Sequence, residues 1–480
     1  MSQRHSRFDQ DDNSVVMKFG GTSVEDEAAI RRLITIVQSR SRNQQPVVVV
    51  SALARVTDQL LEAGRAAANG CLGAALAAVR DIYVRHERLA DSLVGDSAYG
   101  ALDRQLRSDF RALESLLLEL EAAGKLTLKS QDQLLGFGEV FSSRLVKEAL
   151  SEAAVDAAHV DARTCIITDA KHGHANPVWD VTNENLQQAL GPLLQAHCVP
   201  VLGGFISSTL DGVATTLGRG GSDFTAAIVA AALNASRVEI WTDVDGVMTT
   251  DPKLCPDARV IRKMSFDEAA ELAHFGAKVL HPATLAPAMR EDIPVYVLNS
   301  RQPEGNGTEI LAHPDTAPRV RAITAKRNVA AVEVELPRGM DSELLSSVFA
   351  AFDQHSCPVD VMATSQHHVS LLVPCASALP QIASELRDLA DVKWENHKAL
   401  VCLVGENIRR QPEVASRVFG AVTDMDVRVM CQGASDRTIS FLVEEGKVEE
   451  AVQRLHRLFF PKVEPARDWG GIQSAYCQVG

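Results

Sequence analysis

Hydrophobic and polar positions in the first 300 residues alternate between short β-branched runs and longer stretches of helical composition. The apolar runs cover residues 15–19, 47–53, 199–206, 237–244 and 294–299. The helical stretches include residues 25–40, 182–196 and 222–235. Apolar runs of this length read as buried strands. Their alternation with helices predicts an α/β domain with a largely parallel sheet sandwiched by helices.

Four residues stand at the predicted carboxyl ends of these strands: Lys18, Ser51, Gly203 and Asp243. Ligands of open parallel sheets bind beyond the carboxyl ends of the strands. The sequence therefore predicts a binding site where these four residues gather.

Residues 74–122 predict a helical insertion with one apolar stripe. The stripe consists of Leu102, Leu106, Phe110, Leu113 and Leu117. Apolar positions every three or four residues are typical of a helix packed on its neighbours, so we expect this segment to be structural.

The second part of the chain contains an internal repeat. Residues 299–318 are rich in Pro, Gly and polar residues, which marks a domain boundary. Beyond it, a helix followed by two strands occurs at 346–374 and again at 416–445. Each copy has a leading strand before it and a helix after it, which predicts two ferredoxin-like βαββαβ modules.

The expected division of the chain follows from this pattern, although the leading strand of the first module could belong to the second. It comprises a tail at 1–14, a catalytic domain at 15–305, modules at 319–398 and 399–462, and a second tail at 463–480.

Composition narrows the class of protein. The chain has 480 residues and a net charge of -14, which argues against nucleic acid or an anionic membrane as the main partner. No apolar run reaches the roughly 18 residues of a membrane span. The nine cysteines form no Cys-x-x-Cys pair, which predicts reduced thiols in the cytoplasm and no zinc site.

The stretch "VVMKFGGTSVED", residues 15–26, ends a predicted strand with Lys18 followed by Gly20 and Gly21. Glycines let backbone N–H groups approach a ligand closely, and a lysine beside them suggests phosphate. A P-loop places its lysine after the glycines, so this stretch is a different kind of phosphate loop.

A second glycine-rich turn, residues 218–221, precedes a long apolar helix for which Ser222 is the predicted N-cap. Such a helix start binds anions. Arg219 can grip a carboxylate in a two-point fork, and Asp223 offers a charge for an ammonium group. The alternative is a tight strand-to-helix turn with surface charges.

Three further stretches carry weaker signals. Thr242 and Asp243 end a predicted strand, where a hydroxyl and a carboxylate could bind a ribose or a magnesium-bound phosphate. Lys253 could bind a phosphate. Taken alone, however, "DVDG" is an ordinary turn signal. Glu139 is expected to open a helix after two glycines, and Lys278 follows a helix end. Taken alone, both charges could simply complement helix dipoles.

Five stretches in this order resemble the aspartate kinases, most closely the monofunctional class with a C-terminal pair of ACT modules. They are "KFGGTSV", "GE" at 138–139, "TTLGRGGSDFTAA", "WTDVDGVMTTDP" and "FGAKVLHPATL". The resemblance implies an amino-acid-kinase fold. It also implies transfer of the γ-phosphoryl of ATP to the β-carboxylate of L-aspartate, the first step of lysine, threonine and methionine synthesis.

The resemblance also assigns residues. Lys18 and Lys278 look like the cations on the transferring phosphoryl, Arg219 like the clamp on the α-carboxylate, and Glu139 like the partner of the ammonium. The remaining implied aspartate contacts are Ser51, Thr57, Phe205, Ser222 and Asp223. The implied contacts to ATP, which would carry Mg2+, are Lys18, Gly20, Gly21, Thr242, Asp243, Lys253 and Lys278.

For the ACT modules, the resemblance implies an amino-acid effector, lysine or threonine, near Asp360, Thr364 and Ser365, and a homodimer or higher oligomer. The sequence departs from the lysine-type pattern at 337–345, and from the family's turn at Ala54-Arg55.

Two alternatives remain open. One is another kinase of the same fold, acting on glutamate, N-acetylglutamate or uridylate; the paired ACT modules with Arg219 and Glu139 argue against it. The other is a catalytically inactive amino-acid sensor, which the presence of Lys18, Lys253 and Lys278 disfavours.

Overall fold

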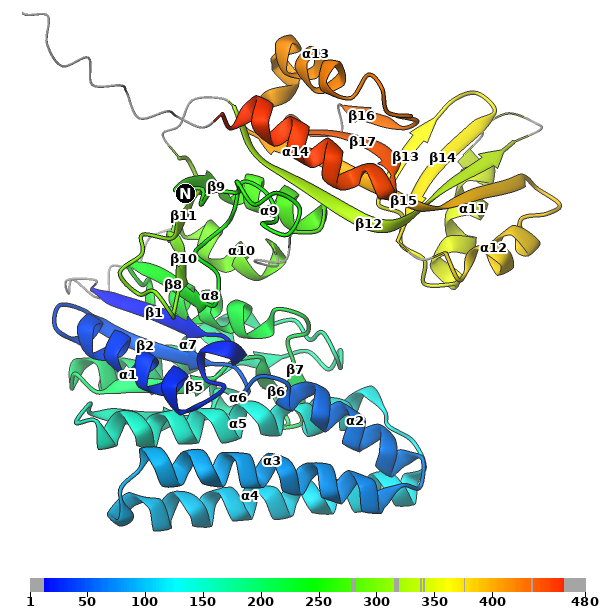
Figure 1. The fold of residues 1–480 in the computed structure, drawn as a ribbon. Coiled ribbons are helices and arrows are strands. Elements are labelled where there is room, and N and C mark those ends of the chain that lie inside the picture. The colour runs from blue at the N-terminus through cyan, green and yellow to red at the C-terminus, as the bar shows by residue number, and fades with distance from the viewer. Residues whose placement is uncertain are drawn as a thin grey trace, which may run out of the picture. The chain divides into compact units, whose positions relative to one another are not determined.

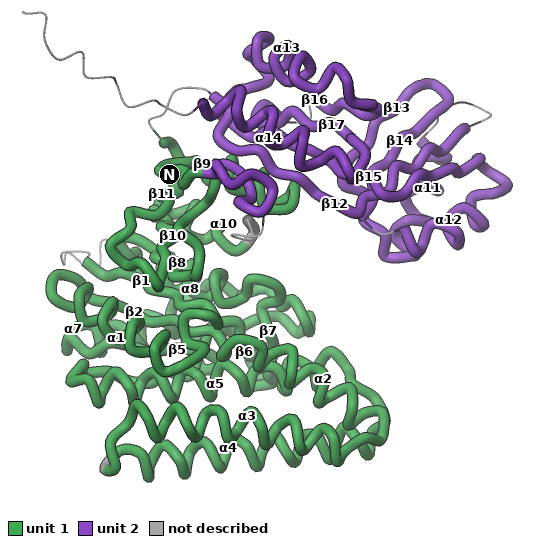
Figure 2. Tube along the Cα trace, in the orientation of Figure 1, with its two compact units in different colours: residues 1–248, 259–317 green, residues 249–258, 318–480 purple. Residues whose placement is uncertain are grey.

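A computed structural model describes residues 13–277, 282–314, 319–336, 339, 342–374, 376–432 and 435–461 (Figure 1). The chain forms two compact units (Figure 2). Unit 1 comprises Met1–Met248 and Arg259–Ala317, and unit 2 comprises Thr249–Ala258 and Pro318–Gly480.

Unit 1 is built on an eight-stranded sheet of order β3-β5-β2-β1-β8-β10-β11-β9. Its strands are β1 Ser14–Phe19, β2 Gln45–Val50, β3 Ala157–Val160, β5 Val199–Gly203, β8 Arg237–Thr242, β9 Lys263–Ser265, β10 Val295–Asn299 and β11 Thr308–Leu311. All neighbouring strands pair in parallel except β10 and β11. The predicted, largely parallel α/β sheet is confirmed.

Helices pack on this sheet in two groups. Helices α1 and α5 contact each other and β2, whereas α8 contacts β1, β2 and β8 together with its neighbours α7 and α10. The helices of unit 1 are α1 Glu27–Ser41, α2 Val56–Ala68, α3 Leu72–Leu93, α4 Asp96–Ala123, α5 Leu128–Glu152, α6 Ala162–Cys165, α7 Trp179–Gln195, α8 Gly221–Leu233, α9 Phe266–His274 and α10 Pro282–Arg290, with a short 3-10 turn η1 at Gly21–Ser23.

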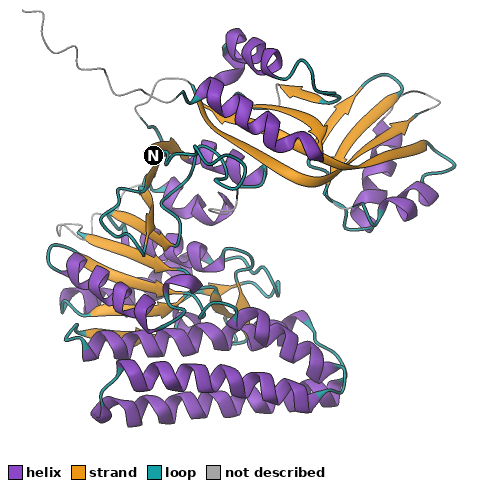
Figure 3. Cartoon of the chain, viewed as in Figure 1, coloured by secondary structure: helices purple, strands orange, loops and turns teal. Residues whose placement is uncertain are grey.

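The predicted insertion consists of α3 and α4, which pack with α2 and α5 into a helical layer (Figure 3). The predicted apolar stripe is buried in this layer, which confirms its structural reading. Its residues are Leu102, Leu106, Phe110, Leu113 and Leu117.

The expected helix start at Glu139 is wrong. Helix α5 begins at Leu128 behind a capping box formed by Thr127 and Ser130, so Glu139 lies in its middle. Gly136 and Gly138 do not interrupt the helix; they let it approach its neighbours. A Cβ atom at Gly138 would lie 2.8 Å from the Cβ of Ala52.

The predicted strand 199–206 divides between two sheets. Strand β5 ends at Gly203, and the chain then enters a three-stranded sheet of order β4-β6-β7. These strands are β4 Ile167–Thr168, β6 Ile206–Thr209 and β7 Ala214–Thr216. Phe205 makes the turn with a φ of 66°, in the left-handed region.

Unit 2 contains one antiparallel six-stranded sheet of order β13-β14-β12-β15-β17-β16. Its strands are β12 Val320–Glu335, β13 Val361–Thr364, β14 His368–Val373, β15 Asp391–Gly405, β16 Met430–Gln432 and β17 Thr438–Glu444. Its helices are α11 Ser342–Gln354, α12 Leu379–Glu385, α13 Pro412–Ala421 and α14 Val448–Phe459, with 3-10 turns η2 at Ile408–Arg410 and η3 at Glu445–Lys447.

The two repeats share the long strands β12 and β15. The first part of β12, including Val320 and Ile323, contributes to one core together with α13 and α14. Its last part, from Ala330 onwards, contributes to a second core with α11 and α12. One strand therefore serves both repeats, and the leading strand expected at the start of the first repeat begins in the core of the second.

Residues 249–258 lie inside the expected catalytic range 15–305 but pack in unit 2. Leu254 and Cys255 are buried in the same core as Val320 and Ile323. The backbone N–H of Ile323 donates to the carbonyl of Thr249 at 2.8 Å, and Gln453 Nε2 donates to the carbonyl of Leu254 at 3.0 Å.

Candidate active site

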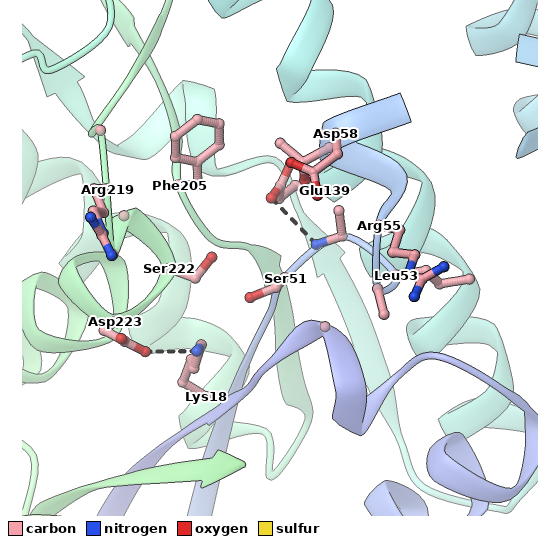
Figure 4. A pocket seen from close by; sticks show the side chains of 17 residues that line it. Lys18, Ser51, Leu53, Arg55, Asp58, Glu139, Phe205, Arg219, Ser222 and Asp223 are labelled. Carbon is pink, nitrogen blue, oxygen red and sulfur yellow. Dashed lines mark hydrogen bonds and ion pairs between the residues drawn. The ribbon is translucent and has the colours of Figure 1, made fainter. Parts of the chain in front are cut away.

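A cavity of about 390 Å³ opens beyond the carboxyl ends of β1, β2 and β5 (Figure 4). Its wall comes from the ends of these strands, the start of α2, the middle of α5 and the start of α8. It brings together nine of the predicted site residues: Lys18, Gly21, Ser51, Thr57, Glu139, Phe205, Arg219, Ser222 and Asp223. Residues up to 205 positions apart in the sequence, Lys18 and Asp223, meet here.

Lys18 and Asp223 form an ion pair at the base of the cavity (Figure 4). The Nζ atom of Lys18, on β1, lies 2.7 Å from a carboxylate oxygen of Asp223, on α8, and each side chain is 13% exposed. Water screens such a sheltered pair poorly, so removing one partner would leave an uncompensated charge. Asp223 thus holds the Lys18 ammonium in place.

Gly21 lets the loop after β1 lie against the loop after β2. The backbone N–H of Ala54 donates to the Gly21 carbonyl at 3.1 Å, and a Cβ at Gly21 would lie 2.9 Å from the carbonyl oxygen of Ala52. Gly20, whose N–H donates to Trp241 O at 3.1 Å, ties the same loop to β8 and does not line the cavity.

Glu139 presents a buried carboxyl group to the cavity. Its side chain is 3% exposed, and Oε1 accepts a hydrogen bond from the N–H of Ala52 at 3.3 Å. Oε2 has no hydrogen-bond partner among the described residues. Burial, only partly offset by the Ala52 N–H, raises the pKa of Glu139 to about 8. This carboxyl can ionise readily only if a cation reaches it.

The turn at 218–221 adopts the left-handed geometry that its glycines permit. Gly218 has a φ of 77° and Gly220 a φ of 73°. Gly220 is the N-cap of α8, so the expectation that Ser222 caps this helix is wrong. Ser222 lies within the first turn instead and packs against Gly204, where a Cβ would come within 2.6 Å of the Ser222 Cβ. The exposed Arg219 stands at the tip of this turn beside the cavity.

The other predicted aspartate contacts are fixed by backbone geometry. Ser51 directly follows β2, and its N–H donates to the carbonyl of Phe19 at 3.0 Å. Thr57 lies in the first turn of α2. The N–H of Phe205 donates to Thr225 Oγ1 at 2.9 Å, which holds the Phe205 turn on α8.

Arg55 and Asp58 also line the cavity, and we did not predict either as a site residue. Arg55 has a φ of 70°, a conformation that glycine adopts easily and arginine does not. The departure from the family pattern at Ala54-Arg55 was the signal in the sequence. It places an additional cation near the cavity.

The predicted nucleotide residues Thr242 and Asp243 lie at the end of β8, outside the cavity, with Thr242 Oγ1 3.3 Å from Asp243 Oδ1. At the adjacent end of β10, Asn299 Nδ2 donates to Asp245 Oδ1 at 2.6 Å. Ser300 Oγ donates to the Thr242 carbonyl at 3.0 Å. Asn299 and Ser300 were missed, although the predicted strand 294–299 ends there.

The two remaining predicted lysines are not part of the cavity. Lys253 belongs to the segment 249–258 that packs in unit 2, where its backbone N–H donates to Asp251 Oδ1 at 2.9 Å. Lys278 lies outside the described residues.

The predicted effector residues lie in unit 2. The Asp360 carboxylate forms an ion pair with Lys326 at 2.6 Å. Thr364 and Ser365 are exposed at and just after the end of the edge strand β13.

The fold is that of the amino-acid-kinase type. The sequence model of the "Amino acid kinase family" matches residues 13–299, and the model of an "ACT domain" matches residues 401–459. Among the described residues, no helix has both the length and the apolar character needed to cross a bilayer.

Individual relatives narrow the class. "Lysine-sensitive aspartokinase 3" of Escherichia coli is 37% identical over 458 residues, which cover 93% of this chain and 99% of that protein. "Aspartokinase 2, chloroplastic" of Arabidopsis thaliana is 33% identical, over 93% of this chain and 84% of that protein. The crystal structure of E. coli aspartokinase III with aspartate and ADP superposes with a TM-score of 0.80 at 36% identity, over 93% and 99% of the two chains.

The chain belongs to the aspartokinases. It is therefore an ATP-dependent kinase of aspartate with a C-terminal ACT region, as the five sequence stretches predicted.

Proposed function

We propose that the cavity at the ends of β1, β2 and β5 holds L-aspartate, and that Lys18 directs its β-carboxylate to the γ-phosphoryl of ATP. The observation that carries this proposal is the convergence of three ionisable groups on one cavity: the Lys18 ammonium, the Arg219 guanidinium and the buried Glu139 carboxyl. Aspartate carries two carboxylates and an ammonium, so each of these groups has a complementary partner on the substrate.

The Arg219 guanidinium pairs with the α-carboxylate, the carboxylate that does not react, because it is a planar fork at the exposed tip of the glycine turn. Glu139 receives the substrate ammonium, which supplies the cation that its buried carboxyl lacks. Ser51, Thr57, Phe205 and Ser222 complete the pocket. These contacts leave the β-carboxylate facing the end of β1, where Lys18 lies.

The reaction forms a bond between a β-carboxylate oxygen and the γ-phosphorus and breaks the bond to the β,γ-bridging oxygen, so that ADP leaves. Phosphoryl transfer of this kind needs positioning and charge neutralisation rather than covalent help from the protein. Lys18 supplies a cation beside the acceptor. Gly21 keeps the backbone of the same loop close, where a side chain would not fit.

ATP approaches from the ends of β8 and β10, with Thr242, Asp243 and Gly20 as contacts and Lys278 as a further cation. Mg2+, which is bound with the phosphates, would shield the charge on the transferring group. Asp243, directly after β8, offers a carboxylate of the kind that Mg2+ prefers.

The first test is the substrate. Purified protein with ATP should form an acyl phosphate, trapped as a hydroxamate, with L-aspartate but not with glutamate, N-acetylglutamate or uridylate. Activity on one of these and not on aspartate would contradict the assignment, and absence of all activity would favour a sensor.

We further propose that the ACT region binds lysine and thereby inhibits the kinase. One relative is called lysine-sensitive, and E. coli aspartokinase III has been crystallised with lysine and aspartate. Asp360 is already paired with the ammonium of Lys326, and a bound lysine offers an ammonium of the same kind in its place. Thr364 and Ser365 lie close by in sequence and are accessible.

Equilibrium dialysis should therefore detect binding of lysine but not threonine, and the D360N variant should lose it. Binding of threonine alone would contradict the identity of the effector.

We also propose a cytoplasmic homodimer or larger homo-oligomer formed through the ACT region. A monomer in light scattering at micromolar concentration would contradict the proposed oligomer.

A further inference from the structure

Asp132 is a buried carboxylate in unit 1 that the proposed mechanism does not use. It lies on α5, seven residues before Glu139. Seven residues are about two helical turns, so both side chains leave the same face of the helix. Asp132 is 1% exposed and does not line the cavity.

Three donors from two separate segments converge on the Asp132 carboxylate. Oδ1 accepts from Thr216 Oγ1, at the end of β7, at 2.5 Å. Oδ2 accepts from His172 Nδ1 at 2.7 Å. The backbone N–H of Gly173 donates to both carboxylate oxygens, at 3.0 and 3.1 Å. A carboxylate with this many donors is well satisfied in a buried position.

The two segments are also attached to each other. The N–H of Ala175 donates to the carbonyl of Thr216 at 2.9 Å. A Cβ at Gly218 would lie 3.0 Å from the carbonyl oxygen of Gly173, so the loop lies directly against the start of the glycine turn. The position of the loop and the position of the turn are therefore set together, and Asp132 binds both.

The glycine turn at residues 218–221 is short, so the position of the residues before it determines the position of Arg219 at its tip. Thr216 is three residues before Arg219, and Leu217 between them donates its N–H to the carbonyl of Phe205 at 2.9 Å. A displacement of Thr216 would therefore move two parts of the cavity lining: Arg219, three residues further along the chain, and Phe205, which is hydrogen-bonded to Leu217.

We infer that Asp132 is a positioning residue for aspartate binding: it fixes the Gly218–Gly221 turn and, through that turn, the guanidinium of Arg219. The inference rests on the proposed role of Arg219 as the clamp on the α-carboxylate. Asp132 itself touches no substrate, so its effect should appear in the binding of aspartate rather than in the chemical step.

The test is a double-mutant cycle of D132N and R219A in the full chain, followed by steady-state kinetics. Asparagine keeps the shape of the side chain but turns an NH2 group toward groups that donate. D132N should raise the KM for aspartate by about tenfold or more, and change kcat and the KM for ATP by less than about threefold. In the R219A background, D132N should change the KM for aspartate no further, because the group it positions is gone.

Independent, multiplicative effects of D132N and R219A on the KM for aspartate would overturn the inference while leaving the role of Arg219 intact. An unchanged KM for aspartate in R219A would overturn both the inference about Asp132 and the proposed role of Arg219. If D132N does not fold, T216V removes a single donor and enters the same cycle, with a smaller increase expected.

Thr182 offers a matched control for a purely structural effect. It is fully buried on α7, where its hydroxyl donates to the carbonyl of Ile167 at 2.9 Å and accepts from the N–H of Ile167 at 3.0 Å. T182V should lower the melting temperature without changing the KM for aspartate. If D132N and T182V show the same ratio of KM change to stability loss, Asp132 is structural and the inference fails.

Discussion

Glu139 shows how burial prepares a single residue for its ligand. In the free protein, burial raises the pKa of this carboxyl to about 8, so the neutral form dominates at pH 7. The substrate ammonium favours the ionised form. Binding of aspartate below pH 8 should therefore release a proton.

This gives a pH dependence with a definite sign. Below pH 8 the fraction of Glu139 that is ionised rises about tenfold per pH unit, so the KM for aspartate should fall as the pH rises from 6 to 8 and level off above it. Measuring the KM between pH 6 and 9 checks this. E139Q should bind aspartate more weakly with a nearly flat profile; a flat profile in the unaltered protein would contradict the assignment.

At the residue scale, the sequence identified most of the cavity but not the reasons for its geometry. Lys18, Arg219 and Asp223 could be predicted because each stands beside glycines at a strand end or helix start. The place of Arg55 on the cavity wall could not, although the departure from the family pattern at Ala54-Arg55 indicated a different turn. Asp132 could not either, because its donors Thr216 and His172 are 84 and 40 residues away.

At the scale of elements, α5 is the clearest difference between the sequence pattern and the structure. Gly136 and Gly138 suggested a helix boundary, since glycine disfavours helices. The structure has a continuous helix that packs closely on its neighbours at both glycines. An added Cβ atom would lie 2.8 Å from the Cβ of Ala52 at Gly138, which leaves no room for it, and 3.2 Å from a methyl carbon of Ile206 at Gly136, which is a tight contact. Such a packing reason depends on residues far away in the chain, and the local pattern cannot reveal it.

This interpretation predicts opposite effects for two glycine-to-alanine changes in helix interiors. G138A places a Cβ atom 2.8 Å from that of Ala52, so it should lower the melting temperature and, through Glu139, raise the KM for aspartate. Gly191 in α7 has nothing within 4 Å of the added atom. G191A should therefore stabilise the protein by about 0.5–1 kcal/mol.

Thermal unfolding and kinetics of the two variants check this prediction. Equal changes in melting temperature for G138A and G191A would show that close packing is not the reason for Gly138. Strands β1, β2, β8 and β10 and the helical insertion, by contrast, were predictable from the local pattern, because their buried residues are continuous or periodic in sequence.

At the scale of the whole molecule, the division into units does not follow chain order. Residues 249–258 follow β8, whose end carries Thr242, yet they belong to the core of unit 2. The stretch "TTDPK", residues 249–253, was interpreted as part of a nucleotide site. Its sequence does not indicate that this segment packs against β12 and α14, much further along the chain. The repeat pattern did allow the leading strand of the first module to belong to the second, but it did not predict that β12 serves both cores.

The position of this segment predicts that its buried side chains stabilise unit 2. L254A removes a buried side chain from the core that also contains Val320 and Ile323, and it should lower the melting temperature of unit 2. L371A is a matched control, because Leu371 is equally part of a buried core in unit 2 but in the other repeat. Both changes should destabilise unit 2 by about 2–5 kcal/mol.

Thermal unfolding of both variants checks this prediction. An unchanged melting temperature in L254A beside a clear loss in L371A would contradict the assignment of residues 249–258 to the core of unit 2.

The central claim is that Lys18 neutralises charge during phosphoryl transfer in the cavity. The most direct measurement is kcat for the K18A variant with saturating aspartate and ATP, alongside K393A, whose side chain is 66% exposed in unit 2 and does not line the cavity. We expect K18A to lower kcat on the order of 10²–10³-fold, as loss of a single electrostatic group does elsewhere, and K393A to leave it unchanged. Near-normal kcat in a folded K18A variant would contradict the account.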